Sequence, residues 1–158
     1  MQKYLGVKII QAVPMSEYDF VGEHKGADEL EKVRADRDNS HGYKVVYEDG
    51  YSSWSPKMVF EKAYRPTDNL TFGLAIEALK QGKRVARLGW NGEGMYLYLT
   101  KGTEVWQARD NALDEIIQKN GVAVINPHID MKAANDTFVI GWLASQTDML
   151  SEDWVVLD

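Results

Sequence analysis

Turn-forming residues divide this sequence into short segments, and this division limits the folds that the chain can adopt. The turns are predicted at Glu48-Asp49-Gly50, Asn91-Gly92, Asn120-Gly121 and Asn135-Asp136. Asp-Gly and Asn-Gly supply the positive φ angles that tight turns between antiparallel strands need. Several of the intervening segments are rich in Val, Ile, Tyr or Trp, which favour strands. We therefore predict an α+β fold, with a mostly antiparallel sheet and a few short helices outside it.

Residues 1–65 are expected to form a small module. Its predicted elements are, in chain order, a strand over 4–13, paired strands over 43–47 and 51–54, and a helix that begins at Ser55-Pro56. Ser55 is the predicted N-cap of that helix, because serine accepts a backbone hydrogen bond there and proline suits the first helical position. The segment 16–39 is polar and heavily charged, with an exposed helix over 28–37 as its candidate element.

A linker over residues 66–69 is predicted to separate this module from a second domain over 70–158. Pro66 biases Arg65 away from helix, and turn-forming and capping residues follow. The predicted elements of the second domain are a helix over 72–79 ended by Gly82, strands over 84–90 and 95–100, a helix over 111–119, strands over 122–125, 129–133 and 137–142, a capped helical turn within 143–153, and a strand over 154–157.

Composition excludes several classes of function. The 158 residues contain no cysteine, which excludes disulfides, thiolate metal sites and a thiol nucleophile. The 18 Lys and Arg residues against 24 Asp and Glu residues give a net charge of -6. Such a chain is poorly suited to coat long nucleic acid, where phosphate neutralisation supplies most of the affinity. With no apolar run that could span a bilayer and no visible signal peptide, we expect a soluble cytosolic protein without a membrane partner.

No pattern of catalytic residues is evident. His128 and Asp130 share one face of a predicted strand and could bind a metal, but no third ligand is identifiable. Ser55 and Ser145 lack the glycine-flanked turn that exposes a serine nucleophile. Ser145 to Asp148 instead matches the S-x-x-[DE] capping pattern. We therefore predict no catalytic residue, no metal and no cofactor.

The glycine-rich segment 89–94 lacks the lysine and the spacing of a phosphate-binding loop. Its default interpretation is a glycine-rich hairpin. Trp90 lies beside the turn, however, and Arg84 and Arg87 are on the strand that leads to it. Aromatic rings stack on nucleobases and arginine binds phosphate, so a small nucleotide pocket is possible. Its candidate members are Arg87, Trp90, Tyr96, Tyr98 and Trp142. Composition alone favours core packing for these aromatic residues instead.

Two longer motifs carry a resemblance to a known family. Residues 71–87 are TFGLAIEALKQGKRVAR, followed by Gly-Trp-Asn-Gly at 89–92. Residues 142–150 are WLASQTDML, followed by Glu-Asp-Trp at 152–154. In combination, and over about residues 70–158, they resemble the Thoeris anti-defence proteins of the second type, a family of small phage proteins. The first module is similar to an N-terminal extension found on some phage proteins, to which no activity is assigned.

The resemblance implies a binding protein and not an enzyme. Members of that family sequester cyclic nucleotide signals of bacterial immune systems without hydrolysing them, in the cytoplasm of the infected host. Their ligands are glycocyclic ADP-ribose isomers and, in some members, cyclic dinucleotides. Members are homo-oligomers, typically tetramers, with pockets where protomers meet. The resemblance therefore implies as partners a small cyclic nucleotide and further copies of the chain.

The resemblance also suggests which residues contact the ligand. Trp90 is the expected stacking platform, Asn91 a polar contact beside it, and Arg84 and Arg87 phosphate contacts. The remaining candidates are Tyr96, Ser145, Gln146, Thr147 and Asp148. The segment 145–148 offers hydroxyl, amide and carboxylate groups to ribose, and its backbone N–H groups at a helix start favour anions. Asp148 would repel phosphate and is assigned to ribose or to capping. Four apolar residues are expected in the core or an interface: Phe72, Ile76, Trp142 and Trp154.

Two other classes of function stay open at this point. One is a metal-dependent cyclic-nucleotide phosphodiesterase that uses His128 and Asp130. The other is a ligand-free structural or interaction module with exposed Trp and Tyr residues as anchors. Ile140-Gly141, which precedes Trp142, departs from the family pattern and leaves the ligand preference open.

Overall fold

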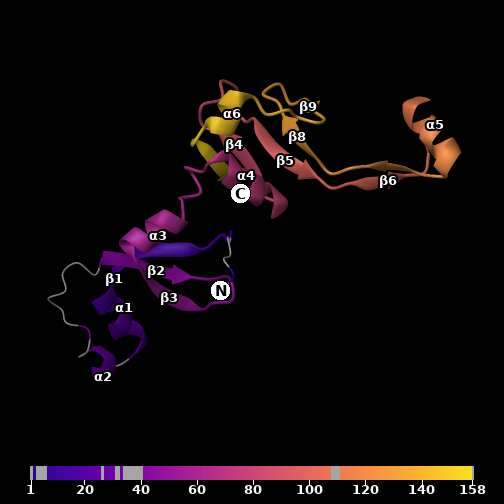
Figure 1. The fold of residues 1–158 in the computed structure, drawn as a ribbon. Coiled ribbons are helices and arrows are strands. Elements are labelled where there is room, and N and C mark those ends of the chain that lie inside the picture. Colours follow the sequence, from indigo (N-terminus) through magenta and orange to yellow (C-terminus); the bar gives the residue numbers. More distant parts are fainter. Residues whose placement is uncertain are drawn as a thin grey trace. The chain divides into compact units, whose positions relative to one another are not determined.

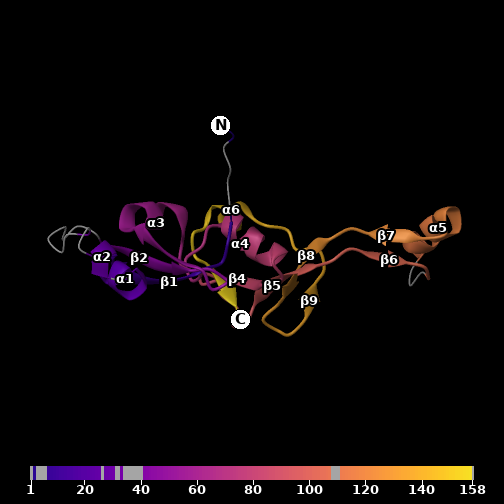
Figure 2. The ribbon, with the colours of Figure 1, turned by 90° about the horizontal axis from the view of Figure 1, so that it is seen from below.

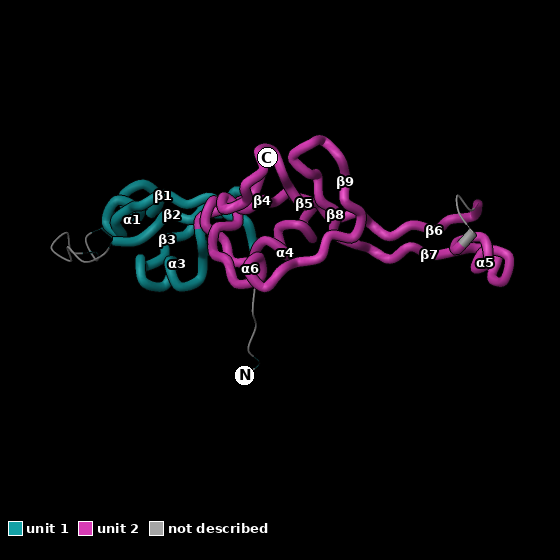
Figure 3. Tube along the Cα trace, turned by 90° about the horizontal axis from the view of Figure 1, so that it is seen from above, with its two compact units in different colours: residues 1–65 teal, residues 66–158 magenta. Residues whose placement is uncertain are grey.

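The computed structural model describes residues 2, 7–25, 27–30, 33, 41–107 and 111–157. The chain divides into two compact units, residues 1–65 and residues 66–158 (Figure 3). Every strand pair among the described residues is antiparallel, and short helices accompany the sheets. The predicted α+β class is therefore confirmed.

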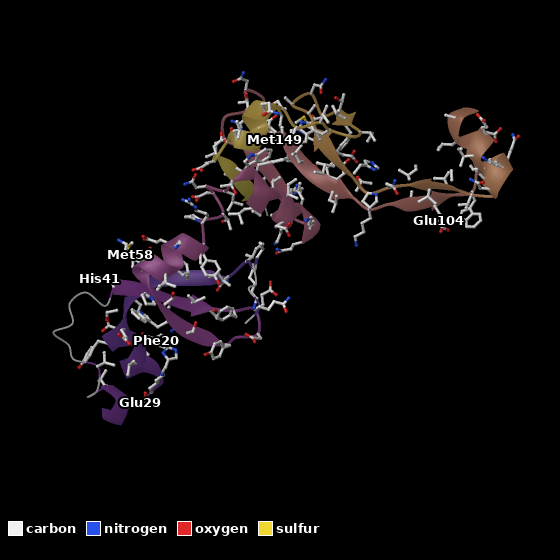
Figure 4. All side chains as sticks on the ribbon, viewed as in Figure 1. Phe20, Glu29, His41, Met58, Glu104 and Met149 are labelled. Carbon is white, nitrogen blue, oxygen red and sulfur yellow. The ribbon has the colours of Figure 1, made fainter. Side chains whose placement is uncertain are left out.

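The first unit is a three-stranded sheet with one helix on each face (Figures 1 and 2). The strands pair in the order β1-β2-β3, and the turn between β2 and β3 contains Gly50 at φ 82°. The elements are β1 (Gln11–Ser16), α1 (Glu17–His24), α2 (Ala27–Leu30), β2 (His41–Val46), β3 (Ser52–Pro56) and α3 (Lys57–Ala63). Figure 4 labels Phe20 on α1 and Met58 on α3, on opposite sides of this sheet.

Successive residues of β2 contact the helices on opposite faces of the sheet. The Tyr43 ring stacks on Phe60 of α3 at 4.2 Å between centroids, whereas the Lys44 ammonium donates to Glu23 of α1 at 2.9 Å. This is the two-residue period of a strand that is covered on both faces. Gly42 is required in β2 because a Cβ there would overlap the Trp54 side chain and the Ser55 carbonyl.

Two predictions for the first unit were wrong, and one helix was missed. The first strand begins at Gln11, since residues 7–10 are not in a strand; residues 4–6 lie outside the described part. Helix α1 was not predicted, although Ser16 caps it by accepting a hydrogen bond from the Asp19 N–H at 3.0 Å. Ser55 does not cap α3: it pairs with Tyr43 inside β3, and Pro56 takes the N-cap position without a side-chain bond. Of the helix predicted over 28–37, residues 31–32 and 34–37 are outside the described part.

The second unit is built on a five-stranded sheet with the strand order β10-β4-β5-β8-β9. Helix α4 packs against β4, β5 and β10, and α6 lies against α4 (Figure 1). The elements are α4 (Phe72–Lys80), β4 (Arg84–Arg87), β5 (Tyr96–Thr100), β8 (His128–Lys132), β9 (Phe138–Val139), α6 (Gln146–Leu150) and β10 (Trp154–Leu157).

The core of this unit lies between α4 and one face of the sheet. Thr71 caps the start of α4. Gly82 follows its end at φ 81°, as the sequence pattern predicts for a helix over 72–79. The buried apolar side chains are Leu70, Ala75, Ala78, Leu79, Val85, Leu97, Met131 and Trp154. Because side chains alternate along a strand, Arg84, Tyr96 and Asp130 belong to the opposite face of the sheet.

A separate two-stranded ribbon extends from this sheet and carries α5 (Asn111–Asn120) at its end (Figure 2). It consists of β6 (Thr103–Val105), which was not predicted, and β7 (Ala123–Ile125); Figure 4 labels Glu104 on it. The predicted strands on either side of Pro127 therefore belong to different sheets. No helix in the described part of the chain is long and apolar enough to cross a membrane.

Candidate functional site around Trp90

Four residues of the second unit form a hydrogen-bonded group that we call the Trp90 cluster: Arg87, Trp90, Asp148 and Asp153. Arg87 ends β4 and Trp90 is in the loop that follows, while Asp148 is in α6 and Asp153 precedes β10. The antiparallel register places Trp154 opposite Arg87, so Asp153 arrives beside the arginine. Segments far apart in the sequence thus meet at one end of the β4–β10 pair.

Arg87 is held by both carboxylates of the cluster. Its Nε donates to Asp153 Oδ1 at 2.8 Å and its Nη2 to Asp153 Oδ2 at 3.2 Å, while Nη1 donates to Asp148 Oδ1 at 2.8 Å. The side chains of Arg87 and Asp148 are only 11% and 13% exposed. Such a charge-assisted, bidentate arrangement is strong and geometrically specific.

Asp148 also fixes the Trp90 ring and the start of α6. Its Oδ1 accepts from the Trp90 indole Nε1–H at 3.1 Å, and its Oδ2 accepts from the Ser145 N–H at 3.1 Å and from the Ser145 hydroxyl at 2.6 Å. The Asp148 N–H in turn donates to Ser145 Oγ at 3.1 Å. This is a complete capping box, as the sequence pattern predicts.

The cluster keeps its carboxylates ionised. Burial alone would raise the pKa of Asp148, but hydrogen bonds from Ser145, Arg87 and Trp90 outweigh burial and lower this pKa to about 2. The hydrogen bond from Arg87 lowers the pKa of Asp153 as well. The hydrogen bond that Arg87 donates to Asp153, and to a lesser extent the one that it donates to Asp148, raise the pKa of the Arg87 guanidinium although burial opposes this. One cation and two anions leave the cluster with a formal charge of −1.

Trp90 belongs to a group of aromatic rings over the core. Its centroid lies 5.5 Å from that of Trp154 and 6.2 Å from that of Trp142, both in edge-to-face geometry. Trp154 is fully buried, as predicted, and its indole donates to the Asp148 carbonyl at 3.0 Å. Trp90 and Trp142 are partly buried and pack against the core cluster. The Trp90 ring is therefore half-buried and held at a defined angle.

The chain between Arg87 and Trp90 requires glycine. A Cβ on Gly89 would lie 2.7 Å from Asp153 Oδ2 and 3.2 Å from Arg87 Nη2. Its N–H donates to the same Asp153 oxygen at 2.8 Å. The glycine therefore lets the loop approach the ion pair closely.

The predicted ligand residues fall into three groups. Arg87, Trp90, Ser145 and Asp148 are brought together in or beside the cluster. Asn91, Gln146 and Thr147 are exposed, the first next to Trp90 and the other two on α6. Arg84 and Tyr96 are separated from the cluster, because they belong to the opposite face of the sheet, where the Arg84 guanidinium lies 5.0 Å from the Tyr96 ring centroid.

Sequence reasoning missed two acidic residues of this domain. Asp153 was given no role, although it holds Arg87; its position directly before the last strand was the available signal. Asp130 was considered only as a metal ligand beside His128, and the nearest distance between them is 3.5 Å, from Nε2 to Oδ1. Within the described ranges, no group of three or more His, Asp or Glu residues could hold a metal ion.

Comparison with known proteins covers this same domain. The sequence model of the Thoeris anti-defense 2-like domain matches residues 70–157, which is more than half of the chain. The chain belongs to this family. A curated relative, named Thoeris anti-defense 2, from Bacillus phage SP01, is 38% identical over 88 residues; the match covers 56% of this chain and 94% of the relative.

The Thoeris anti-defense 2-like domain includes all four residues of the Trp90 cluster and both sheets of the second unit. Residues 1–65 lie outside the match. The resemblance drawn from the two sequence motifs is therefore confirmed, and the chain carries an anti-defence domain of a type found in a phage.

Proposed function

We propose that residues 66–158 bind a small cyclic nucleotide immune signal and sequester it without cleavage, with Trp90 as the surface on which a base stacks. The ligand class proposed is a glycocyclic ADP-ribose isomer or a cyclic dinucleotide. Removal of the signal would keep the effector of the host defence system inactive. The observation that carries the proposal is the half-buried Trp90 ring, whose orientation is fixed by Asp148 and by Trp154.

A pre-positioned ring supports binding for a physical reason. An aromatic side chain contributes about 1–3 kcal/mol to stacking on one base, and a ring that is already ordered loses little conformational entropy when the ligand arrives. The indole N–H of Trp90 is used internally at 3.1 Å from Asp148, so it is not the group proposed to contact a ligand. Stacking, not a hydrogen bond from the indole, is therefore the interaction proposed.

Polar contacts are proposed for the exposed residues around the ring. Asn91, Gln146 and Thr147 expose amide and hydroxyl groups that suit ribose hydroxyls or phosphate oxygens. Arg87 has two acidic partners, so its proposed role is to hold Asp148 and Asp153 in place and not to contact a phosphate. Arg84 and Tyr96 would reach the same ligand only from another copy of the chain, which agrees with the proposed homotetramer with pockets between protomers.

Isothermal titration calorimetry with purified glycocyclic ADP-ribose isomers and cyclic dinucleotides tests this function. We expect one class to bind, and heating the complex to release the nucleotide intact, as judged by mass spectrometry. Trp90→Ala should lower the affinity by about tenfold or more, from the loss of stacking. Trp106→Ala is the matched control, because Trp106 is 64% exposed on the separate ribbon.

Each alternative has its own outcome. Recovery of a cleaved nucleotide would overturn sequestration and favour a phosphodiesterase, whose dependence on His128 and on a chelator could then be measured. No binding heat and no thermal shift with any of these nucleotides would favour a ligand-free interaction module. Equal loss of affinity in Trp90→Ala and Trp106→Ala would place the binding surface elsewhere.

A further inference from the structure

Asp130 is the one charged residue whose side chain is buried among those described, with 2% exposure. It lies in the middle of β8, on the face of the sheet opposite α4. A buried carboxylate is costly unless its oxygens accept hydrogen bonds. Both of its oxygens are used: Oδ2 accepts from the Thr100 hydroxyl and Oδ1 from the Gly141 N–H at 2.8 Å.

The bond to Gly141 marks an irregularity in the sheet. Val139 pairs with Met131, and two residues of β8 earlier the Ile129 carbonyl accepts from the Trp142 N–H at 2.7 Å. Between these two links, Ile140 and Gly141 stand opposite Asp130 alone. Two residues against one is the arrangement of a β-bulge. Gly141 has a φ of 75°, the left-handed conformation that favours glycine. The Asp130 carboxylate accepts from the N–H that the bulge leaves without a backbone partner.

The bulge decides which face of the sheet carries Trp142. Side chains alternate along a strand, so regular pairing beyond Val139 would place Trp142 opposite His128, on the face that carries Asp130. One additional residue reverses the alternation. Trp142 instead lies 6.4 Å from Phe72 of α4 and 6.2 Å from Trp90, between ring centroids. The bulge thus delivers Trp142 to the Trp90 cluster.

We propose that Asp130 is a positioning residue for the Trp90 surface: by holding the Gly141 N–H it fixes the bulge that turns Trp142 towards Trp90. Its effect on nucleotide binding rests on the proposed function, whereas its effect on the bulge does not. His128, whose Nε2 is 3.5 Å from Asp130 Oδ1, and Tyr98, opposite Asp130 in β5, flank the carboxylate on the same face.

Amide hydrogen exchange of the full-length protein, followed by NMR, tests the anchor without any ligand. Asp130→Ala should increase the exchange rates of the Gly141 and Trp142 amides by about tenfold or more, from the loss of a bond to a charged acceptor. Asp130→Asn should restore much of their protection, since the amide oxygen can accept from Gly141 while its NH₂ donates to Thr100. Thr100→Val is the control that removes the other bond and leaves Gly141 held.

A second variant tests the bulge through the backbone conformation of Gly141. Gly141→Ala adds a methyl group that meets no atom within 4 Å, so its effect comes from the positive φ angle alone. It should perturb the same two amides with Asp130 intact, which covers the case in which Asp130→Ala does not fold. Unchanged exchange of Gly141 and Trp142 in a folded Asp130→Ala variant, or in Gly141→Ala, would overturn the anchor.

The binding consequence is measured separately. If wild type binds glycocyclic ADP-ribose or a cyclic dinucleotide, Asp130→Ala should raise the dissociation constant by about tenfold and Thr100→Val by much less. Faster exchange with unchanged affinity would refute the link to binding but keep the bulge anchor. If wild type binds none of these nucleotides, the proposed function fails, and the exchange rates alone decide the anchor.

Discussion

Replacing Asp148 by Asn should destabilise the second unit at neutral pH and remove a pH-dependent part of its stability. The Asp148 carboxylate accepts hydrogen bonds from Arg87, Trp90 and Ser145, so all partners of the carboxylate are donors. The Asn NH₂ group would face at least one of these donors. We expect a loss of about 2–3 kcal/mol at pH 7, the usual cost of leaving such a buried partner unsatisfied.

The magnitude of the pH-dependent part follows from the pKa. Lowering the pKa of Asp148 from the ordinary value of 3.8 to about 2 corresponds to about 2.4 kcal/mol. Because the pKa is lower in the folded state, this stability is present above pH 3.8 and is lost as the pH falls towards 2. Linkage predicts that the wild-type protein loses about 1 kcal/mol from this group between pH 6 and pH 3. The side chain of Asp148→Asn cannot titrate in this range. The difference in the free energy of unfolding between wild type and this variant should therefore narrow by about 1 kcal/mol from pH 6 to pH 3.

Urea unfolding followed by tryptophan fluorescence measures this difference. Four of the five tryptophans lie in residues 66–158, so the signal reports mainly on the second unit. Asp68→Asn is the control, because Asp68 is an exposed carboxylate of the same unit. A difference between wild type and Asp148→Asn that stays constant from pH 6 to pH 3, or a variant as stable as wild type at pH 7, would refute this reasoning.

Two glycine positions give further predictions. Gly89→Ala should destabilise the second unit by about 1–3 kcal/mol, because the new Cβ would lie 2.7 Å from Asp153 Oδ2; urea unfolding tests this, and Gly73→Ala, which meets no atom closer than 3.9 Å, should not lose stability. Gly42→Ala should unfold the first unit, because its Cβ would overlap the Trp54 ring; native-state proteolysis should cut residues 1–65 first, and a variant as resistant as wild type would contradict this expectation.

Local signals predicted most elements of the second unit. Gly82 and the spacing of Phe72, Ala75, Ile76 and Leu79 predict α4, and the alternation of apolar and polar residues predicts β5. Both depend on neighbours within a few positions. The pairing of β7 with β6 instead of with β8 depends on contacts distant in the sequence. No local pattern reports such a choice, which explains why it was missed.

The errors in the first unit come from competing local signals. Ser55-Pro56 is a good start for an isolated helix. The hairpin register instead places Ser55 opposite Tyr43, so Ser55 is part of β3 and does not cap the helix. Helix α1 lacks a wide apolar stripe, since its buried residues are the adjacent pair Phe20 and Val21. Its cap, Ser16, was therefore the stronger available signal.

In the candidate site too, contacts between sequence neighbours were predictable and contacts between distant residues were not. The capping box of Ser145 and Asp148 was visible as a four-residue pattern and is present. The same carboxylate also holds Arg87 and Trp90, which lie 61 and 58 positions earlier in the sequence. The capping pattern explains Asp148 locally, but it does not reveal that the same carboxylate binds Arg87 and Trp90.

Because Asp148 and Asp153 hold Arg87, the negative charge of this cluster limits where the phosphates of the proposed ligand can lie. A free Arg87 would have been the obvious phosphate contact, but two carboxylates compensate its charge and leave the cluster at −1. A nucleotide phosphate placed on the cluster itself would meet net repulsion, which is strong at low dielectric. The ligand orientation that fits this geometry has a base on the Trp90 ring and its phosphates turned away from Asp148 and Asp153. In the proposed complex, the phosphates would face exposed polar residues such as Asn91, or the Arg84 of another copy, and the ion pairs would serve to hold the ring.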